Sequence, residues 1–414
     1  MSDKLAIDGG EPVRREPMPP RCLLGEEEKA AAMEVFDCAI AAGSTFGYNG
    51  PYEQQYEKGF VEFMGGGFAD GVNSGSNAMY CALGGLQLDA LSEVIVPPIS
   101  DPGGVMPVPL LACVPVFADA DGRGYNTSAE QIAPLITERT RAIVVAHIAG
   151  EPVEMDPILD LARKHGLYVI EDCAQAHGAR YKGRLAGTFG DFAIFSTMHG
   201  KHYCTGGQGG VVYTRDEKLH WQAKRFADRG KPFNIEGAAG NVVAGLNCNL
   251  NDLAAAIGSS QLKKLPGIIQ RRHEVGEALK QGLKQRKAVS MGWQPPQTWC
   301  VYWFARLTLD QAALRVDKAT FCRALDAEGI HATVSYRHIP CEWPWFADKA
   351  VFGRGGFPWN CSDYRGERDP SYPMTNAIRV TDTNFNIGVH ENYTQREIAD
   401  ILGAIEKVER AYLR

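Results

Sequence analysis

The chain has 414 residues, of which 45% are hydrophobic and 22% are charged. This length and composition exclude a disulfide-stapled miniprotein, a disordered chain and a fibrous protein, and they allow two or three globular domains. The 43 basic and 49 acidic side chains give a net charge of −6, which provides no basic excess for binding nucleic acid.

The first half of the chain predicts helices that alternate with short strands. After an N-terminal arm of residues 1–24, apolar residues at helical spacing predict helices over 25–42 and 51–64. Short apolar runs, each flanked by Gly, Pro or a helical stretch such as 157–165, then predict strands at 93–96, 114–117, 142–146, 168–170 and 192–195. This alternation is typical of an α/β domain whose central sheet is largely parallel.

The second half of the chain begins with a long helical pattern over 250–284, in which Pro266 is expected to kink or interrupt the helix. From residue 299 onward the sequence predicts a strand at 301–307, a helix at 318–328, a loop rich in Trp, Pro and Gly at 342–373 and a final helix at 394–413. We therefore predict an N-terminal arm (1–24), a large α/β domain (25–265) and a smaller α+β domain (266–414).

Two features of the sequence favour a cytoplasmic location. No run approaches the roughly 18 apolar residues that span a bilayer, and residues 1–10 carry three charges instead of a signal-peptide core. The 11 cysteines are odd in number and never stand in C-x-x-C spacing, which indicates reduced thiols and predicts no metal site.

The first motif that could carry chemistry is the Gly-Ser pair of residues 73–78, where a predicted strand gives way to a helix. Ligands of such sheets bind at the carboxyl ends of the strands. Backbone N–H groups at the helix N-terminus, together with the Ser76 hydroxyl, would form an anion site suited to a phosphate ester. Taken alone, the motif is more often a simple helix N-cap than a phosphate site, because Ser is a favoured cap.

Two further motifs follow predicted strands. Residues 171–178 (EDCAQAHG) place Asp172 at a strand end, where a carboxylate could accept a proton-bearing ring nitrogen or could merely cap a turn. Residues 195–210 place Lys201 beside hydroxyl residues and before a glycine-rich turn, which suits a desolvated nucleophilic amine, although a single lysine is more often a solvated charge. An anion site, a ring-nitrogen acid and an amine occur in the order that a pyridoxal phosphate enzyme needs.

These motifs resemble those of the DegT/DnrJ/StrS family of fold-type I sugar aminotransferases. The resemblance runs from residues 5–14 to the final helix, and its most specific parts are 171–179, the turn around Lys201 with its Gly-Gly-Gln-Gly-Gly sequence, and 251–258 followed by Gln261-Leu262. Within the family the chain is similar to the cyclitol aminotransferases and the aminohydroxybenzoate synthases. The implied fold is a mostly parallel, seven-stranded central sheet with helices on both faces.

The resemblance also implies a role for individual residues around pyridoxal 5'-phosphate. Lys201 would form the internal Schiff base, and Asp172 would pair with the pyridinium nitrogen and keep it protonated. Gln175 would lie against or beside the ring. The remaining cofactor-binding residues implied are Gly75, Ser76, Asn77 and Ser196, with Asn247 contributed by the neighbouring subunit of a homodimer.

The implied reaction moves an amino group from glutamate or glutamine to a keto sugar or keto cyclitol, nucleotide-linked or free. Lys201 would carry the proton as general base and acid, and its presence favours amino transfer over the related dehydratases that lack it. A keto-octulosonic sugar acid is an alternative acceptor. A regulatory or binding protein that keeps the fold without turnover is the alternative from another class.

Several positions depart from the pattern of the family. Asp101 stands where most members place an aromatic side chain that stacks on the cofactor, Gln208 replaces a Glu, and Asn249 replaces an Arg. In the loop 342–373, aromatic and Arg side chains could form a lid over the substrate or a hydrophobic cluster beneath a long loop. Whether His147, His199, His202 and His338 line the cleft or only pack is left open by the sequence.

Overall fold

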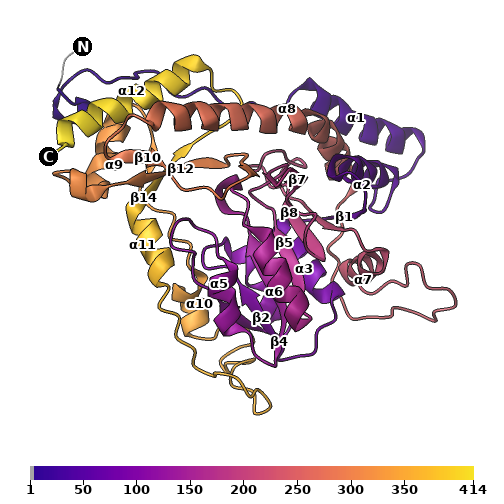
Figure 1. Cartoon of the computed structure of the whole chain (residues 1–414). Helices are drawn as coiled ribbons and strands as arrows, with labels where there is room; N and C mark the ends of the chain where they lie inside the picture. Colours follow the sequence, from indigo (N-terminus) through magenta and orange to yellow (C-terminus); the bar gives the residue numbers. More distant parts are fainter. Residues whose placement is uncertain (1–3) are drawn as a thin grey trace.

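The computed structural model describes residues 4–414 and contains a large central sheet (Figure 1). The strand order of that sheet is β1-β9-β8-β5-β4-β2-β3. Its strands are β1 (Phe68–Val72), β2 (Glu93–Val96), β3 (Val114–Phe117), β4 (Thr140–Ala146), β5 (Tyr168–Asp172), β8 (Phe192–Ser196) and β9 (Gly210–Thr214). Strand β9 pairs antiparallel with β1 and β8, whereas the other neighbouring strands pair in parallel. This confirms the mostly parallel, seven-stranded sheet.

Both faces of the large sheet are covered, as the alternating side chains of β4 show. Val144 packs into one core cluster with α3 (Gly75–Gly85), whereas its neighbours Ile143 and Val145 pack into another with α6 (Met155–His165). Because successive side chains of a strand point to opposite faces, these two clusters lie on opposite sides of the sheet. A near-continuous apolar strand is typical of a parallel sheet buried on both faces.

A second sheet lies toward the C-terminus and is antiparallel throughout, with strand order β10-β12-β14-β13. Its strands are β10 (Val289–Met291), β12 (Phe304–Leu309), β13 (Ala332–Thr333) and β14 (Asn384–Gly388). Helices α9 (Lys318–Ala327) and α12 (Gln395–Tyr412) share its hydrophobic core, and Leu5 of the N-terminal arm inserts into the same core. We call this body, with the C-terminal half of α8, the small lobe, and the body around the large sheet the large lobe.

The remaining elements are short or lie on the outside of the two lobes. The other helices are α1 (Glu26–Ala41), α2 (Pro51–Met64), α4 (Pro107–Leu110), α5 (Ala129–Ile132), α7 (Glu217–Ala227), α8 (Asp252–Leu283), α10 (Pro344–Ala347) and α11 (Thr375–Thr383). A minor three-stranded sheet contains β6 (Arg180–Tyr181), β7 (Arg184–Leu185) and β11 (Thr298–Trp299). Among residues 4–414, no helix combines the length and apolarity required to cross a membrane.

Helix α8 connects the lobes without interruption, although Pro266 lies inside it (Figure 1). Leu262 and Leu265 pack with α2 in the large lobe, whereas Leu279 and Leu283 pack with the small sheet. The expectation that Pro266 could interrupt the helix is therefore wrong, because apolar contacts along both halves hold the helix together despite the missing N–H group. The domain boundaries after residues 24 and 265 stay predictions.

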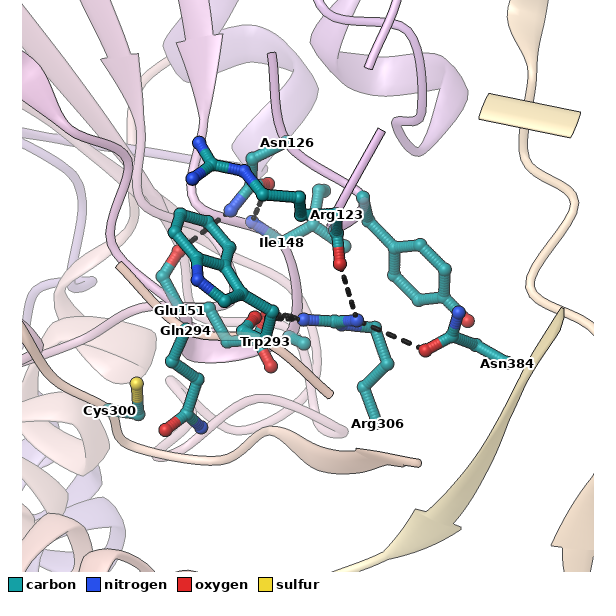
Figure 2. A network of polar contacts seen from close by, with 12 residues as sticks. Arg123, Asn126, Ile148, Glu151, Trp293, Gln294, Cys300, Arg306 and Asn384 are labelled. Carbon is teal, nitrogen blue, oxygen red and sulfur yellow. Dashed lines mark hydrogen bonds and ion pairs between the residues drawn. The ribbon is translucent and has the colours of Figure 1, made fainter. Parts of the chain in front are cut away.

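A buried ion pair joins the two lobes away from α8 (Figure 2). Arg306 of β12 donates from Nη2 to Oε2 of Glu151 at 2.9 Å, and from Nη1 to Oδ1 of Asn384 at 3.0 Å. Arg306 is fully buried, and it also contacts the backbone carbonyl of Trp293. Burial raises the pKa of the Glu151 carboxyl, while the Arg306 charge acts to lower it. A charge pair shielded from water thus links the small lobe to the large lobe.

Candidate active site

A cavity opens at the carboxyl ends of the strands of the large sheet, as expected for this class of sheet. Its wall includes five residues that the sequence singles out for the cofactor: Gly75, Ser76, Asp172, Ser196 and Lys201. These residues lie at the ends of β5 and β8 or follow β1 and β8, so the fold brings together positions more than a hundred residues apart.

Asp172 is the last residue of β5 and is 8% exposed. Its Oδ1 accepts a hydrogen bond from the backbone N–H of Ala174 at 2.9 Å, which fixes the carboxyl group at the strand end. Burial raises the pKa of Asp172, while that N–H and the Lys201 charge act to lower it. The negative charge of a buried carboxylate such as this one is stabilised most by a cationic group placed in the cavity.

Lys201 lies on the turn between β8 and β9 and is 7% exposed. Burial lowers the pKa of its amine, and the carboxylates of Asp172 and Asp101 partly oppose that effect. Its Nζ lies 4.3 Å from the ring centroid of Trp303, which directly precedes β12 of the small lobe. A buried lysine with a lowered pKa is readily deprotonated, which is what a nucleophilic amine requires.

The N-terminus of α3 forms another part of the wall. Here Ser74 is the N-cap, because its hydroxyl accepts a hydrogen bond from the N–H of Asn77 at 3.1 Å. The capping role that the sequence allowed for this segment thus falls to Ser74, and Ser76 lines the cavity. A helix N-terminus with a neighbouring hydroxyl is suited to bind an anion.

Close backbone approach shapes the cavity at three glycines. A Cβ at Gly75 would lie 2.7 Å from the Cβ of Ser196, and one at Gly103 would lie 2.2 Å from the Oγ of Ser76. A Cβ at Gly104 would lie 2.8 Å from Oδ2 of Asp172. Sequence reasoning missed Gly103 and Gly104, although their Gly-Gly pair directly after Asp101-Pro102 is a turn signal.

Three of the residues named from the sequence lie outside the cavity wall. Gln175 is buried beside it, where its Oε1 accepts from the N–H of Ala149 at 2.8 Å and its Nε2 donates to the hydroxyl of Tyr336 at 2.9 Å. Asn77 donates from its side chain to Asn73. Asn247 is exposed, and its side-chain oxygen accepts from Asn249.

The three positions that depart from the pattern of the family differ in whether they line the cavity. Asp101 and Gln208 both line the cavity. Asp101 also caps a short 3-10 turn by accepting from the N–H of Gly103 at 3.0 Å. Asn249 contacts Asn247 and Asn49 instead of the cavity wall. A carboxylate therefore lines the cavity at the position where most members of the family have an aromatic ring.

The loop 342–373 packs against the large sheet instead of the cavity. Trp359 and Tyr364 are buried in the same core cluster as Phe117 of β3, and the Tyr364 hydroxyl donates to Glu93 at the start of β2. The start of β2 lies at the edge of the sheet opposite to the cavity. Arg365 is exposed and donates to the carbonyl of Ser362. Of the two arrangements that the sequence allowed for this loop, Trp359 and Tyr364 thus form the hydrophobic cluster and not a lid over the substrate.

The histidines that the sequence left open separate into buried and exposed groups. His147 accepts at Nδ1 from the N–H of Val153, so its Nε2 carries the proton and donates to Glu171 at 3.0 Å. His202 is buried behind Lys201, and His199 is exposed. None of these three lies in the cavity wall, and neither does His338, which stacks on Tyr336.

Comparisons with known proteins identify the family to which the chain belongs. The profile of the DegT/DnrJ/EryC1/StrS aminotransferase family matches residues 26–359. The chain therefore belongs to this family and is an aminotransferase, as the resemblance in the sequence predicts.

Two relatives and one solved structure indicate the range of similarity. The chain is 32% identical to the L-glutamine:2-deoxy-scyllo-inosose aminotransferase of Streptomyces lividus, over 82% of each chain. It is 32% identical to the GDP-perosamine synthase of Escherichia coli O157:H7, over 62% of this chain and 70% of the synthase. The aminotransferase structure from Psychrobacter cryohalolentis matches with a TM-score of 0.83 at 27% identity, covering 95% of this chain and 99% of that one.

Proposed function

We propose that this protein is a pyridoxal 5'-phosphate-dependent aminotransferase that moves an amino group from glutamate or glutamine to a keto sugar or keto cyclitol. The observation that carries the proposal is that Lys201 and Asp172, both buried, open onto one cavity whose wall includes the N-terminus of α3. An amine, an acid and an anion site are the three groups that hold this cofactor.

The residues present fit the cofactor in both shape and chemistry. Gly75, Gly103 and Gly104 keep the wall free of side chains that would clash with Ser196, Ser76 and Asp172. Ser76, Ser196 and the N-terminal N–H groups of α3 would hold the phosphate. Asp172 would pair with the ring nitrogen, Gln175 would lie beside the ring, and Lys201 would hold the cofactor as a Schiff base. When bound, the cofactor supplies an electron sink for the carbon that gains or loses nitrogen.

The chain itself would supply the proton transfers. The burial that lowers the pKa of Lys201 favours its neutral amine, which can take a proton from the substrate carbon as a general base. The same burial raises the pKa of Asp172, so its charged form is best stabilised when a protonated nitrogen lies opposite. The two residues thus complement each other, one as proton carrier and the other as a fixed negative charge.

We propose that the enzyme works as a homodimer with shared active sites, and two features support this. Asn247, implied as a cofactor ligand across an interface, is exposed and lies outside the cavity wall of its own subunit. Helix α1 exposes Met33, Phe36 and Ile40 at helical spacing on one face, with Ile40 75% exposed. Such a face is typical of a protein interface.

We also propose a cytoplasmic location. The free cysteines support it, because thiols stay reduced in the cytoplasm.

An acceptor whose ring carries no carboxylate is favoured over a keto sugar acid. The carboxylate of Asp101 lines the cavity beside that of Asp172, and Gln208 adds no positive charge. The two carboxylates would repel a carboxylate carried on the acceptor ring, and they can accept hydrogen bonds from the hydroxyl groups of a sugar or cyclitol. The names of the relatives, one acting on an inosose and one making a sugar nucleotide product, are consistent with this class of acceptor.

The test is a half-reaction followed by absorbance. The purified protein, loaded with pyridoxal phosphate, is expected to be yellow and to lose that colour when glutamate or glutamine is added. A panel of 2-deoxy-scyllo-inosose, a nucleotide-linked 4-keto sugar and a keto-octulosonic acid should then restore the colour only with an uncharged-ring acceptor. If the protein binds the cofactor but keeps its colour with both glutamate and glutamine, the proposal is contradicted. The protein would then be a binding protein that keeps the fold without turnover.

A further inference from the structure

Three successive carbonyl groups of the lysine turn accept hydrogen bonds from side chains outside the large lobe. The carbonyl of Gly200 accepts from Nε1 of Trp303 at 3.2 Å. The carbonyls of Lys201 and His202 accept from Nη1 and Nη2 of one guanidinium group, that of Arg21 in the N-terminal arm. The turn lies between β8 and β9, where strand pairing does not supply these partners.

The energetic reason for this arrangement is burial. Lys201 and His202 are buried, and a buried carbonyl without a partner costs free energy comparable to a lost hydrogen bond. One planar guanidinium satisfies two carbonyls at once, which a lysine at position 21 could not do in the same geometry. Arg21 therefore fixes the path of the backbone on both sides of the Lys201 side chain.

The guanidinium of Arg21 is itself held in place. Its Nε donates to Oε1 of Glu391 at 2.7 Å, and Oε2 of Glu391 accepts from Nε of Arg272 in α8 at 3.0 Å. Arg272 is 3% exposed and also donates to the carbonyl of Trp303. Burial and the charge of Arg21 lower the pKa of Arg272 to about 10. This chain of contacts connects the N-terminal arm, α8 and the small lobe to the lysine turn.

The same contacts reach the reactive amine. Trp303, which holds the carbonyl of Gly200, also lies with its ring 4.3 Å from Nζ of Lys201. Groups outside the large lobe thus contact both the backbone of the turn and the tip of the lysine side chain. A displacement of about 1 Å in a reacting group can cost a hundredfold in rate, so this support matters for catalysis.

We propose that Arg21 is a positioning residue of the active site, which sets the placement of Lys201 by holding the carbonyls of Lys201 and His202. The N-terminal arm is then part of the catalytic apparatus and not only a cover of the small lobe. The proposal rests on the proposed role of Lys201 as the cofactor-bearing amine. Arg21 does not itself line the cavity and contacts the backbone of Lys201, not its amine, so it acts through the turn.

The test compares Arg21→Ala and Arg21→Lys in the full-length protein loaded with pyridoxal phosphate, with Arg15→Ala as the matched control. Arg15 is an exposed arginine of the same arm and pairs only with Glu11 in the contacts of the described residues. The readouts are the rate of colour loss after glutamate is added, the absorbance maximum of the bound cofactor, and the rate of borohydride reduction at Lys201.

We expect Arg21→Ala to bind the cofactor but to lose colour with glutamate at least tenfold more slowly, with altered absorbance and reduction rate. Arg21→Lys should recover part of the loss because it keeps one charged donor, and Arg15→Ala should behave as the wild type. A second variant, Glu391→Gln, loosens the guanidinium without removing it and should slow the half-reaction in the same direction.

The proposal is overturned if Arg21→Ala reacts within twofold of the wild-type rate with unchanged absorbance. It is also overturned if Arg21→Ala fails to fold while Glu391→Gln reacts as the wild type, since Arg21 would then act only on stability. Failure of the proposed function is distinguishable, because in that case borohydride would not label Lys201 even in the wild-type protein.

Discussion

Replacing Arg306 with Met should destabilise the protein strongly, because it leaves a buried charge without a partner. Glu151 and Arg306 are both nearly inaccessible to water, with side-chain exposures of 4% and 0%. In Arg306→Met, Oε2 of Glu151 loses both hydrogen bonds from the guanidinium, and Oε1 already lacks a partner among the described residues. Removing one member of such a pair costs about 3–5 kcal/mol.

The assay is urea unfolding followed by far-UV circular dichroism, with Arg323→Met as the control because Arg323 is exposed on α9. The double variant Arg306→Met, Glu151→Gln should be more stable than Arg306→Met alone, since it removes the unpaired charge. Burial already raises the pKa of Glu151, so the penalty of the single variant should shrink as the pH falls and the carboxyl takes up a proton. The reasoning would be refuted if Arg306→Met lost less than about 1 kcal/mol of unfolding free energy. It would also be refuted if the losses of Arg306→Met and of the single variant Glu151→Gln simply added up to the loss of the double variant.

Three further predictions concern the cavity and α2. Asp172→Asn should slow colour loss with glutamate by about a hundredfold, because an amide cannot keep the ring nitrogen protonated. This is the equivalent of two pKa units or about 2.7 kcal/mol. An unchanged rate would show that Asp172 is not the partner of the ring nitrogen. Gly104→Ala should weaken cofactor binding in an absorbance titration, since its methyl would lie 2.4 Å from Oγ of Ser100, whereas Gly207→Ala, with open space around it, should not. Burial raises the pKa of Glu53 to about 8, so the folded state keeps a proton that the unfolded state loses, and stability should fall between pH 4.5 and 8. Glu53→Gln should reduce that fall by up to about 1.4 kcal/mol per pH unit. The measurement is the free energy of urea unfolding at pH 5 and at pH 8, and an equal change in the wild type and in Glu53→Gln would contradict the prediction.

The local pattern of the sequence predicted ranges for five of the seven strands of the large sheet, all but β1 and β9, and the physical reason is burial. The strands predicted at 93–96 and 114–117 have those bounds in β2 and β3, because apolar residues between turn signals have few other ways to be buried. The helix predicted at 51–64 coincides with α2, which begins with Pro at the first helical position and ends before Gly65 in the left-handed conformation.

The parts of the structure that depend on long-range contacts were not predictable from local pattern. The strand expected at 301–307 begins at Phe304, because the backbone N–H groups of Val301 and Trp303 donate to the carbonyls of Gly150 and Ala149 and not to the small sheet. The contact of Arg21 with the carbonyl of Lys201 spans 180 positions, and nothing in the arm sequence indicates it. The aromatic residues of the loop 342–373 gave no sign of which surface they cover.

The candidate site shows the same division. Asp172 and Lys201 follow strands, where an α/β sheet places its ligands, so their positions could be inferred from the sequence. Gly103 and Gly104 act through close backbone approach to Ser76 and Asp172, which is a property of the folded cavity. That Ser74 and not Ser76 caps α3 required the backbone geometry.

The most direct test of the account is to locate the amine that holds the cofactor. The protein is loaded with pyridoxal phosphate, reduced with borohydride, digested and sequenced by mass spectrometry. The account predicts that the pyridoxyl group is attached to Lys201 and that Lys201→Ala remains unlabelled. Attachment to a different lysine, or no attachment at all, would contradict it.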